Sequence, residues 1–204
     1  MIKLEDIFKK SENFIEKDFV NLSGYPDLQF QKDIYDWALS DVPFNHSYNI
    51  VDIGSACSHI YNHAKIVGKK YIGIEPDIEL YNEANKLFSE NFNDSFTVIN
   101  AYFERVNDID FKNSIVLCIG TLNVIVPESD KYTQFKIFLE KINLEDRHFG
   151  GMALFIFNVG TESELNTFDI SKIFTDVYPN LSNLSFKIEA NTLFEGLVKL
   201  TIYR

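Results

Sequence analysis

A run of very small residues follows an apolar, strand-like segment that ends at Ile53. The run reads Gly54-Ser-Ala-Cys-Ser58, and Asp52 stands just before it. Such a turn is slim, and glycine permits close approach of a ligand to the backbone. The next apolar segment ends at Glu75, 21 residues beyond Gly54. A carboxylate at that place can accept hydrogen bonds from both hydroxyls of a ribose, so the two segments together predict a nucleoside site.

A second interpretation of Glu75 is purely structural. An acid beside Pro76 is typical of the first turn of a helix, where a negative charge offsets the helix dipole. The slim turn after Ile53 favours the ribose interpretation, because the two features together make a place for a nucleoside.

The spacing of the small residues argues against a dinucleotide. A dinucleotide site uses the pattern G-x-G-x-x-G, because backbone N–H groups must approach a pyrophosphate. Counted from Gly54, the second and third glycines are replaced by Ala56 and His59, and the chain has no P-loop pattern G-x-x-x-x-G-K-[ST]. The turn therefore indicates a nucleoside with little or no phosphate. A nicotinamide-dependent oxidoreductase with a degenerate turn stays open as an alternative.

The elements that position these residues alternate between strand and helix. Residues 1–46 show a roughly helical spacing of apolar residues. Beyond them, strand-like runs alternate with helical patterns, one of which is predicted directly after the turn and ends near Gly68. The last two strand-like runs, 184–190 and 197–203, have no helical pattern between them and predict a hairpin. The earlier predicted strands are 48–53, 71–74, 96–99, 115–119 and 152–159.

Continuous apolar strands that alternate with helices are typical of a parallel sheet covered on both faces. Ligands of such sheets bind beyond the carboxyl ends of the strands. We therefore expect an α/β protein whose functional residues directly follow its strands.

The turn and the acid carry a resemblance to a known family. Asp52-x-Gly54-x-Ala56-x-Ser58, followed by Glu75, resembles the D/E-x-G-x-G-x-G turn of class I S-adenosylmethionine-dependent methyltransferases. The resemblance implies a Rossmann-like, doubly wound, seven-stranded sheet with the strand order 3-2-1-4-5-7-6. Only the seventh strand would be antiparallel, as part of a terminal antiparallel hairpin.

The same resemblance implies the organisation of the chain. It covers about residues 48–204, which contain the strands and the hairpin. We expect a single methyltransferase-like domain over residues 1–204, with a helical N-terminal cap at 1–46 and a cofactor-binding core at 47–204.

The resemblance further implies a role for the residues at the strand ends. Gly54 and Ala56 would lie against the methionine part of S-adenosylmethionine, and Asp52 would orient its ammonium group. Glu75 would hold the ribose hydroxyls, and Asn100 would read the adenine. The residues implied to bind this cofactor are Asp52, Gly54, Ser55, Ala56, Glu75, Pro76, Asn100, Ala101, Gly120 and Thr121.

The sequence departs from the family pattern in three places. Ala56 and Ser58 stand where the family has glycines, and Asn100 stands where aspartate is commoner. An amide oxygen can still accept a hydrogen bond from the adenine amino group. The [DNS]-P-P-[YFW] loop of enzymes that methylate amino groups of nucleic acids is absent after the fourth strand, where the sequence is Gly120-Thr-Leu-Asn123.

Other reactive side chains fit simpler roles. His59 and His63 have a spacing that can bind zinc, but a third ligand is missing and the chain has no H-E-x-x-H motif, so no metal site is predicted. Cys57 would have a lowered pKa at a helix N-terminus, yet a small filler beneath the cofactor is the favoured interpretation. No side chain is assigned as a general base or as any other catalytic residue.

The charge balance restricts the partners. Lys plus Arg number 19 against 30 Asp plus Glu, which gives a net charge of −11, and the basic residues are scattered. Such a field repels polyphosphates, so we expect a small-molecule methyl acceptor and no nucleic acid. No apolar run approaches the ~20 residues of a membrane helix, so no membrane partner is expected. The two cysteines fit a reducing, cytoplasmic location.

We therefore expect a methyltransferase that uses S-adenosylmethionine and transfers the methyl group in line to a small molecule. A non-catalytic partner subunit with the same fold stays open beside the oxidoreductase, because no general base is evident in the sequence. Turnover of the methyl donor would separate these alternatives.

Overall fold

The computed structural model places two compact units along the chain, residues 1–101 and 102–204. The expectation of one domain over the whole chain stays a prediction. Of the predicted helical N-terminal cap at 1–46, residues 1–27, 45 and 46 lie outside the described residues. The residues that the structure describes are 28–44, 48–63, 66, 69–88, 95–121, 131–144, 151–158, 167–179, 184–192 and 196–203.

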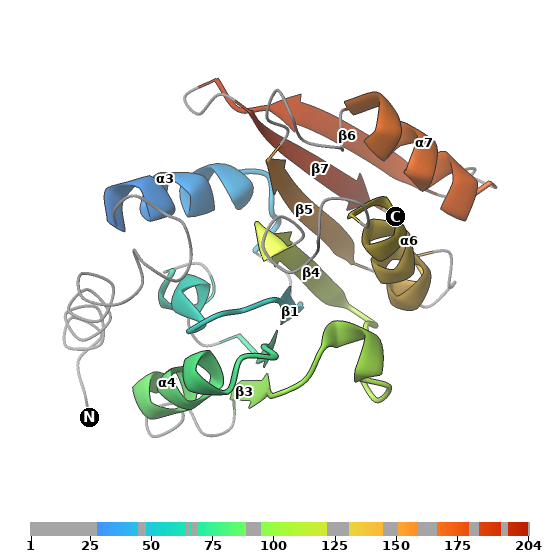
Figure 1. Ribbon diagram of the computed structural model, residues 1–204. Helices are drawn as coiled ribbons and strands as arrows, with labels where there is room; N and C mark the ends of the chain where they lie inside the picture. The colour runs from blue at the N-terminus through green and yellow to red at the C-terminus, as the bar shows by residue number, and fades with distance from the viewer. Residues whose placement is uncertain are drawn as a thin grey trace. The chain divides into compact units, whose positions relative to one another are not determined.

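The strands form a seven-stranded sheet. They are β1 (Asn49–Ile53), β2 (Tyr71–Ile74), β3 (Phe96–Ile99), β4 (Ser114–Ile119), β5 (Met152–Asn158), β6 (Ser185–Ala190) and β7 (Leu197–Tyr203). Their order is β3-β2-β1-β4-β5-β7-β6 (Figure 1). β7 is antiparallel to both of its neighbours, β5 and β6. The predicted fold class, strand order and terminal hairpin are therefore confirmed.

The helices of the first unit are α3 (Leu28–Ala38), α4 (Ile78–Phe88) and the short 3-10 helix η2 (His59–Asn62). β2 lies between β1 and β3 and is parallel to both. Four aromatic rings fill the space beside these strands, with neighbouring centroids 5.0 to 5.5 Å apart, and they belong to Tyr61, Tyr71, Phe88 and Phe96. This aromatic cluster joins η2, α4 and the sheet.

The predicted α-helix after β1 is wrong for the described residues. Only η2 follows the turn, and His63 then adopts an extended conformation with φ −64° and ψ 127°. All four side chains of η2 are buried, whereas an amphipathic α-helix would expose one face. The tight turn thus directs four consecutive side chains into the core, which the apolar spacing of the sequence could not indicate.

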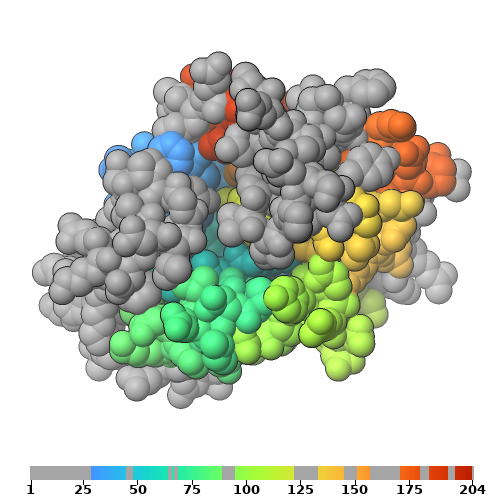
Figure 2. All heavy atoms as spheres, in the orientation of Figure 1, coloured from blue at the N-terminus to red at the C-terminus, as the bar shows by residue number. Residues whose placement is uncertain are grey.

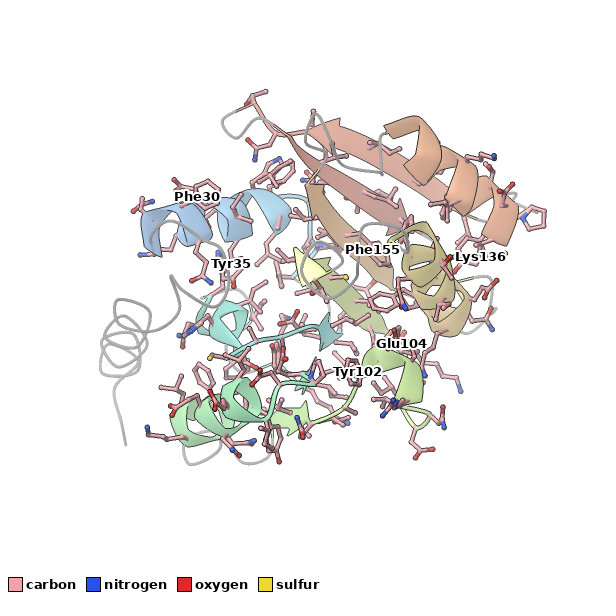
Figure 3. All side chains as sticks on the ribbon, in the orientation of Figure 1. Phe30, Tyr35, Tyr102, Glu104, Lys136 and Phe155 are labelled. Carbon is pink, nitrogen blue, oxygen red and sulfur yellow. The ribbon has the colours of Figure 1, made fainter. Side chains whose placement is uncertain are left out.

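The second unit contains α6 (Lys131–Ile142), α7 (Thr167–Val177) and the 3-10 helix η3 (Phe103–Arg105). Phe135 of α6 packs on Phe155 of β5, with ring centroids 5.1 Å apart, and Phe174 of α7 packs on Phe186 of β6 at 4.7 Å. Lys136 lies on the outer side of α6 (Figure 3).

Phe155 and Phe186 lie on the same face of the sheet, because they pair in register with alternate residues of β7. α6 and α7 therefore cover one face of the second unit's strands. Tyr178, just beyond α7, joins these helices because its hydroxyl donates a hydrogen bond to the carbonyl oxygen of Leu139 at 2.5 Å. No helix in the described ranges is long and apolar enough to span a membrane.

Candidate functional site

The turn after β1 has three residues in the left-handed region of the backbone. Gly54 has φ 69°, Ala56 has φ 47° and Ser58 has φ 58°. These are the three positions at which the resemblance implies glycines. A left-handed conformation costs an L-residue roughly 1–2 kcal/mol, and such strain persists where the surrounding structure over-determines it. The backbone therefore has the left-handed conformation typical of glycine at all three positions, although two of them are occupied by alanine and serine.

The turn is fixed against the neighbouring strand β2. The backbone N–H groups of Gly54 and Ser55 both donate hydrogen bonds to the carbonyl oxygen of Ile74, at 2.9 and 3.1 Å. A Cβ atom on Gly73 would come within 2.7 Å of the Ser55 hydroxyl oxygen. Gly73 therefore permits a close approach between β2 and the turn that any larger residue would obstruct.

Glu75 follows β2, and its carboxylate joins the turn to the start of α4. One oxygen, Oε2, accepts a hydrogen bond from the backbone N–H of Ala56 at 2.8 Å, and Oε1 accepts one from Asp77 at 2.8 Å. Glu75 is only 6 % exposed. Each carboxylate oxygen has two lone pairs, so each retains one acceptor position. The two remaining positions match the two hydroxyls of a ribose.

Burial raises the pKa of the Glu75 carboxyl, and the hydrogen bonds from Asp77 and Ala56 act in the opposite direction. These two donors orient the carboxylate before any ligand arrives. Preorganised acceptors bind a diol without first losing side-chain freedom.

The helical interpretation of Glu75 is wrong. α4 begins at Ile78, and Asp77 caps it: Oδ1 of Asp77 accepts hydrogen bonds from the backbone N–H groups of Glu79 at 2.8 Å and Leu80 at 3.2 Å. A capping acid at this position satisfies the unpaired donors of the helix. Glu75 stands outside the helix, although its carboxylate accepts the backbone N–H of the capping residue Asp77.

Ile78 is an apolar residue that sequence reasoning missed. It is 54 % exposed, and α4 lies at the surface of the molecule (Figure 2). The buried face of α4 carries Ala84 and Phe88, and helical spacing places Ile78 off that face. Its position away from the apolar face of the predicted helix could have identified Ile78 from the sequence as an exposed apolar residue. An exposed apolar side chain therefore stands three residues after Glu75.

Asn100 follows β3 and reaches back to the segment after β2. Its Nδ2 group donates hydrogen bonds to the carbonyl oxygens of Glu75 at 2.9 Å and Pro76 at 3.1 Å. Both N–H donors of the amide are therefore directed at the backbone, and Oδ1 is the acceptor that the side chain can offer to a ligand. An aspartate here would bring a carboxylate against two carbonyl oxygens, whereas the amide donates a hydrogen bond to each of them. Ala101, the next residue, is half-buried.

Asp52 lies near the end of β1 with its carboxyl group buried, at 4 % exposure. The Tyr71 hydroxyl donates a hydrogen bond to its Oδ2 at 2.5 Å. Burial raises the pKa of Asp52 to about 7, the Tyr71 hydrogen bond opposes this shift, and the nearby charge of Glu75 adds to it. Tyr71 was missed by sequence reasoning, because its place at the start of β2 indicates only a core aromatic.

Burial keeps the reactive side chains near the turn in their uncharged forms. Burial raises the pKa of the Cys57 thiol to about 12, so the lowering expected from a helix N-terminus is wrong, since no α-helix begins there. Burial also lowers the pKa of His59 to about 3, which leaves its imidazole neutral. His63 Nε2 lies 2.8 Å from Asp36 Oδ1 of α3. Within the described ranges, no three His, Cys, Asp or Glu side chains group to hold a metal ion.

The first unit thus brings together most of the predicted site. Hydrogen bonds link the turn from Gly54 to Ala56 with Ile74 and Glu75, and link Asn100 with Glu75 and Pro76. Asp52 is bound to Tyr71 of the neighbouring strand. Gly120 and Thr121 belong to the second unit. Gly120 follows β4 with φ 73°, and Thr121 is buried. Their part in the site stays a prediction.

No protein-family model and no curated protein matches the sequence. Solved structures match over most of the chain. An S-adenosylmethionine-dependent methyltransferase from Leishmania major is 15 % identical, with a TM-score of 0.62 over 99 % of this chain and 86 % of its own. Magnesium protoporphyrin IX methyltransferase from Synechocystis, solved with bound S-adenosylmethionine, is 13 % identical, with a TM-score of 0.57 over 100 % and 98 %.

A third match is a Clostridium thermocellum protein assigned as an rRNA methylase. It is 14 % identical, with a TM-score of 0.57 over 85 % of this chain and 96 % of its own. Identities this low show the fold, and this chain has the fold of class I S-adenosylmethionine-dependent methyltransferases. The resemblance read from the turn and Glu75 is confirmed at that level.

Proposed function

We propose that this chain is a methyltransferase that uses S-adenosylmethionine and transfers its methyl group in line to a small-molecule acceptor. The observation that carries the proposal is the Glu75 carboxylate, oriented by two backbone donors with one acceptor position left on each oxygen. Its position at the end of β2, beside the slim turn, is where a nucleoside ribose is bound in folds of this kind.

The other residues of the first unit fit the rest of the cofactor. Asn100 keeps an amide oxygen for the adenine amino group, because its donors are bound to the backbone. Ile78 offers an apolar surface for the base, and the buried Asp52 offers a carboxyl for an ammonium group. When bound, the cofactor supplies an electrophilic methyl group on a sulfonium.

The contribution of the protein to transfer is alignment. Holding two reactants in line removes an entropic barrier worth roughly 7–11 kcal/mol. Gly120 and Thr121, directly after β4, are proposed to be cofactor-binding residues that lie near the reacting sulfonium. No side chain is assigned as a general base.

The choice of a small acceptor rests on charge. The matched proteins include one named for a protoporphyrin and one assigned to rRNA, so the fold is compatible with either class of substrate. The net charge of −11 opposes a polyanion and favours a neutral or cationic small molecule.

The proposal is tested by comparing two ligands in thermal unfolding. S-adenosylhomocysteine, the product of the donor, should raise the melting temperature by about 5–10 °C at roughly 100 times its Kd, because binding to the folded state adds about 2.7 kcal/mol. NADH should give no shift at the same concentration. A shift with NADH and none with S-adenosylhomocysteine would replace the proposal with the oxidoreductase alternative. The antiparallel β7 already counts against that alternative.

A further inference from the structure

A cavity of about 330 Å³ lies in the second unit, between the segment that precedes β4 and the carboxyl end of α6. These two parts of the chain lie side by side at the surface (Figure 2). A volume of this size is at the lower end of the range for small-molecule sites. The residues that line the cavity all lie within 106–112 and 141–143, and none of the proposed cofactor-binding residues is among them.

Four side chains give the cavity an apolar wall. Ile142 is almost fully buried, at 2 % exposure. Val106, Ile109 and Phe111 are half-buried. The Phe111 ring is held by Phe103, whose ring meets it edge-on with the centroids 6.2 Å apart. A ligand with an apolar body would gain affinity by leaving water for this wall.

Lys141 supplies an ammonium group that is already held in place. Its Nζ donates a hydrogen bond to the carbonyl oxygen of Glu104 at 2.8 Å and lies 5.4 Å from the centroid of the Phe103 ring. An ammonium group has three donors, and the described residues engage one of them in a hydrogen bond. Two donors therefore remain for a ligand, and the side chain has already lost freedom that binding would otherwise remove.

The charges that line the cavity favour an anion. Lys112 is exposed, and no hydrogen bond or ion pair with the described residues engages its ammonium group. The opposing charge is Asp110, whose Oδ1 accepts a hydrogen bond from the backbone N–H of Lys112 at 2.9 Å. The carboxyl end of α6 adds about half an elementary charge of negative sign. Two ammonium groups against one carboxylate therefore still leave a positive balance.

The cavity is remote from the residues that follow β4. This strand begins at Ser114, just after Lys112, and ends at Ile119, directly before Gly120. A strand of six residues is about 20 Å long, so the cavity lies at the opposite end of β4 from Gly120 and Thr121. A methyl acceptor that reacts near those two residues would therefore not occupy the cavity.

We propose that the cavity binds a second small molecule, a monocarboxylate with an apolar body, independently of the methyl donor. The carboxylate meets the ammonium groups of Lys141 and Lys112, and the apolar body lies against Phe111 and Ile142. This inference does not rest on the proposed function, because none of the proposed cofactor-binding residues takes part in it.

Three probes of similar shape test the charge preference: phenylacetate, phenylacetamide and 2-phenylethylamine. Each is titrated into the isotopically labelled full chain, and the backbone amide signals are followed by NMR. Phenylacetate should shift the signals of residues 106–112 and 141–143, with a Kd of about 1 mM or below. The neutral amide should bind at least about fivefold more weakly, and the amine more weakly still, because neither is attracted by the two ammonium groups.

Two lysine variants test the lining. Lys112→Gln removes a charge from an exposed position, so the fold should be unaffected and phenylacetate should bind about two- to fivefold more weakly. Lys136→Gln is the matched control, because Lys136 lies on the outer side of α6, 3.8 Å from Glu140, and does not line the cavity. It should bind phenylacetate as the wild type does. An equal loss in both variants would indicate only the overall charge and would overturn the site.

The wild-type protein alone can also contradict the proposal. Signals that shift elsewhere, no shift at about 10 mM phenylacetate, or equal binding of the amine would each overturn it. Displacement of phenylacetate by S-adenosylhomocysteine would show that the two sites are not independent, which also contradicts it. A protein that binds phenylacetate here but does not bind S-adenosylhomocysteine would refute the proposed function and leave this site standing.

Discussion

At the scale of single residues, the sequence did not indicate the backbone conformation of the site. The residue types predicted a slim turn at Gly54 and a ribose-binding acid at Glu75, because size and charge are visible in the sequence. The left-handed conformations of Ala56 and Ser58 were not, since an alanine or serine ordinarily avoids that region. The role of Tyr71 was also hidden, because its contact with Asp52 exists only between adjacent strands.

The strain at Ala56 makes a prediction about stability. Ala56→Gly should relieve a left-handed conformation that costs roughly 1–2 kcal/mol, offset by the greater freedom of glycine in the unfolded chain, worth about 0.5–1 kcal/mol. A net gain of about 0.5–1 kcal/mol is therefore expected in urea unfolding.

The matched control is Ala84→Gly in α4, where the backbone is helical and the residue is buried. That change should lose about 1 kcal/mol, since glycine is unfavourable inside a helix. Equal losses in both variants would mean that Ala56 is not strained.

At the scale of elements, the strands were predictable and the segment after β1 was not. Continuous apolar runs predicted the strands β1 to β5. The last two runs predicted a hairpin, because no helical pattern lies between them. The apolar spacing after the turn also fitted a helix, but tertiary packing buried all four residues of η2 and ended it at His63. The capping of α4 by Asp77 was likewise missed, because Glu75 and Pro76 offered an equally plausible start.

At the scale of the whole molecule, charge decides the expected partners. A protein that binds nucleic acid gains affinity from each phosphate it neutralises, and this chain has 19 basic against 30 acidic residues. We predict no measurable binding to duplex DNA or structured RNA at physiological salt. A mobility-shift titration checks this prediction. A tight, salt-sensitive complex would overturn the small-molecule acceptor and leave the methyl-transfer proposal intact.

The central claim is that Glu75 binds the ribose of S-adenosylmethionine, and calorimetric titration of two variants tests it most directly. Glu75→Ala removes two charge-assisted acceptors, so binding of S-adenosylhomocysteine should weaken by about 2–4 kcal/mol, roughly 30- to 1000-fold in Kd. Glu79→Ala, which removes the same charge from an exposed position on α4, should bind as the wild type does. Unchanged affinity in a folded Glu75→Ala protein, or an equal loss in both variants, would contradict the claim.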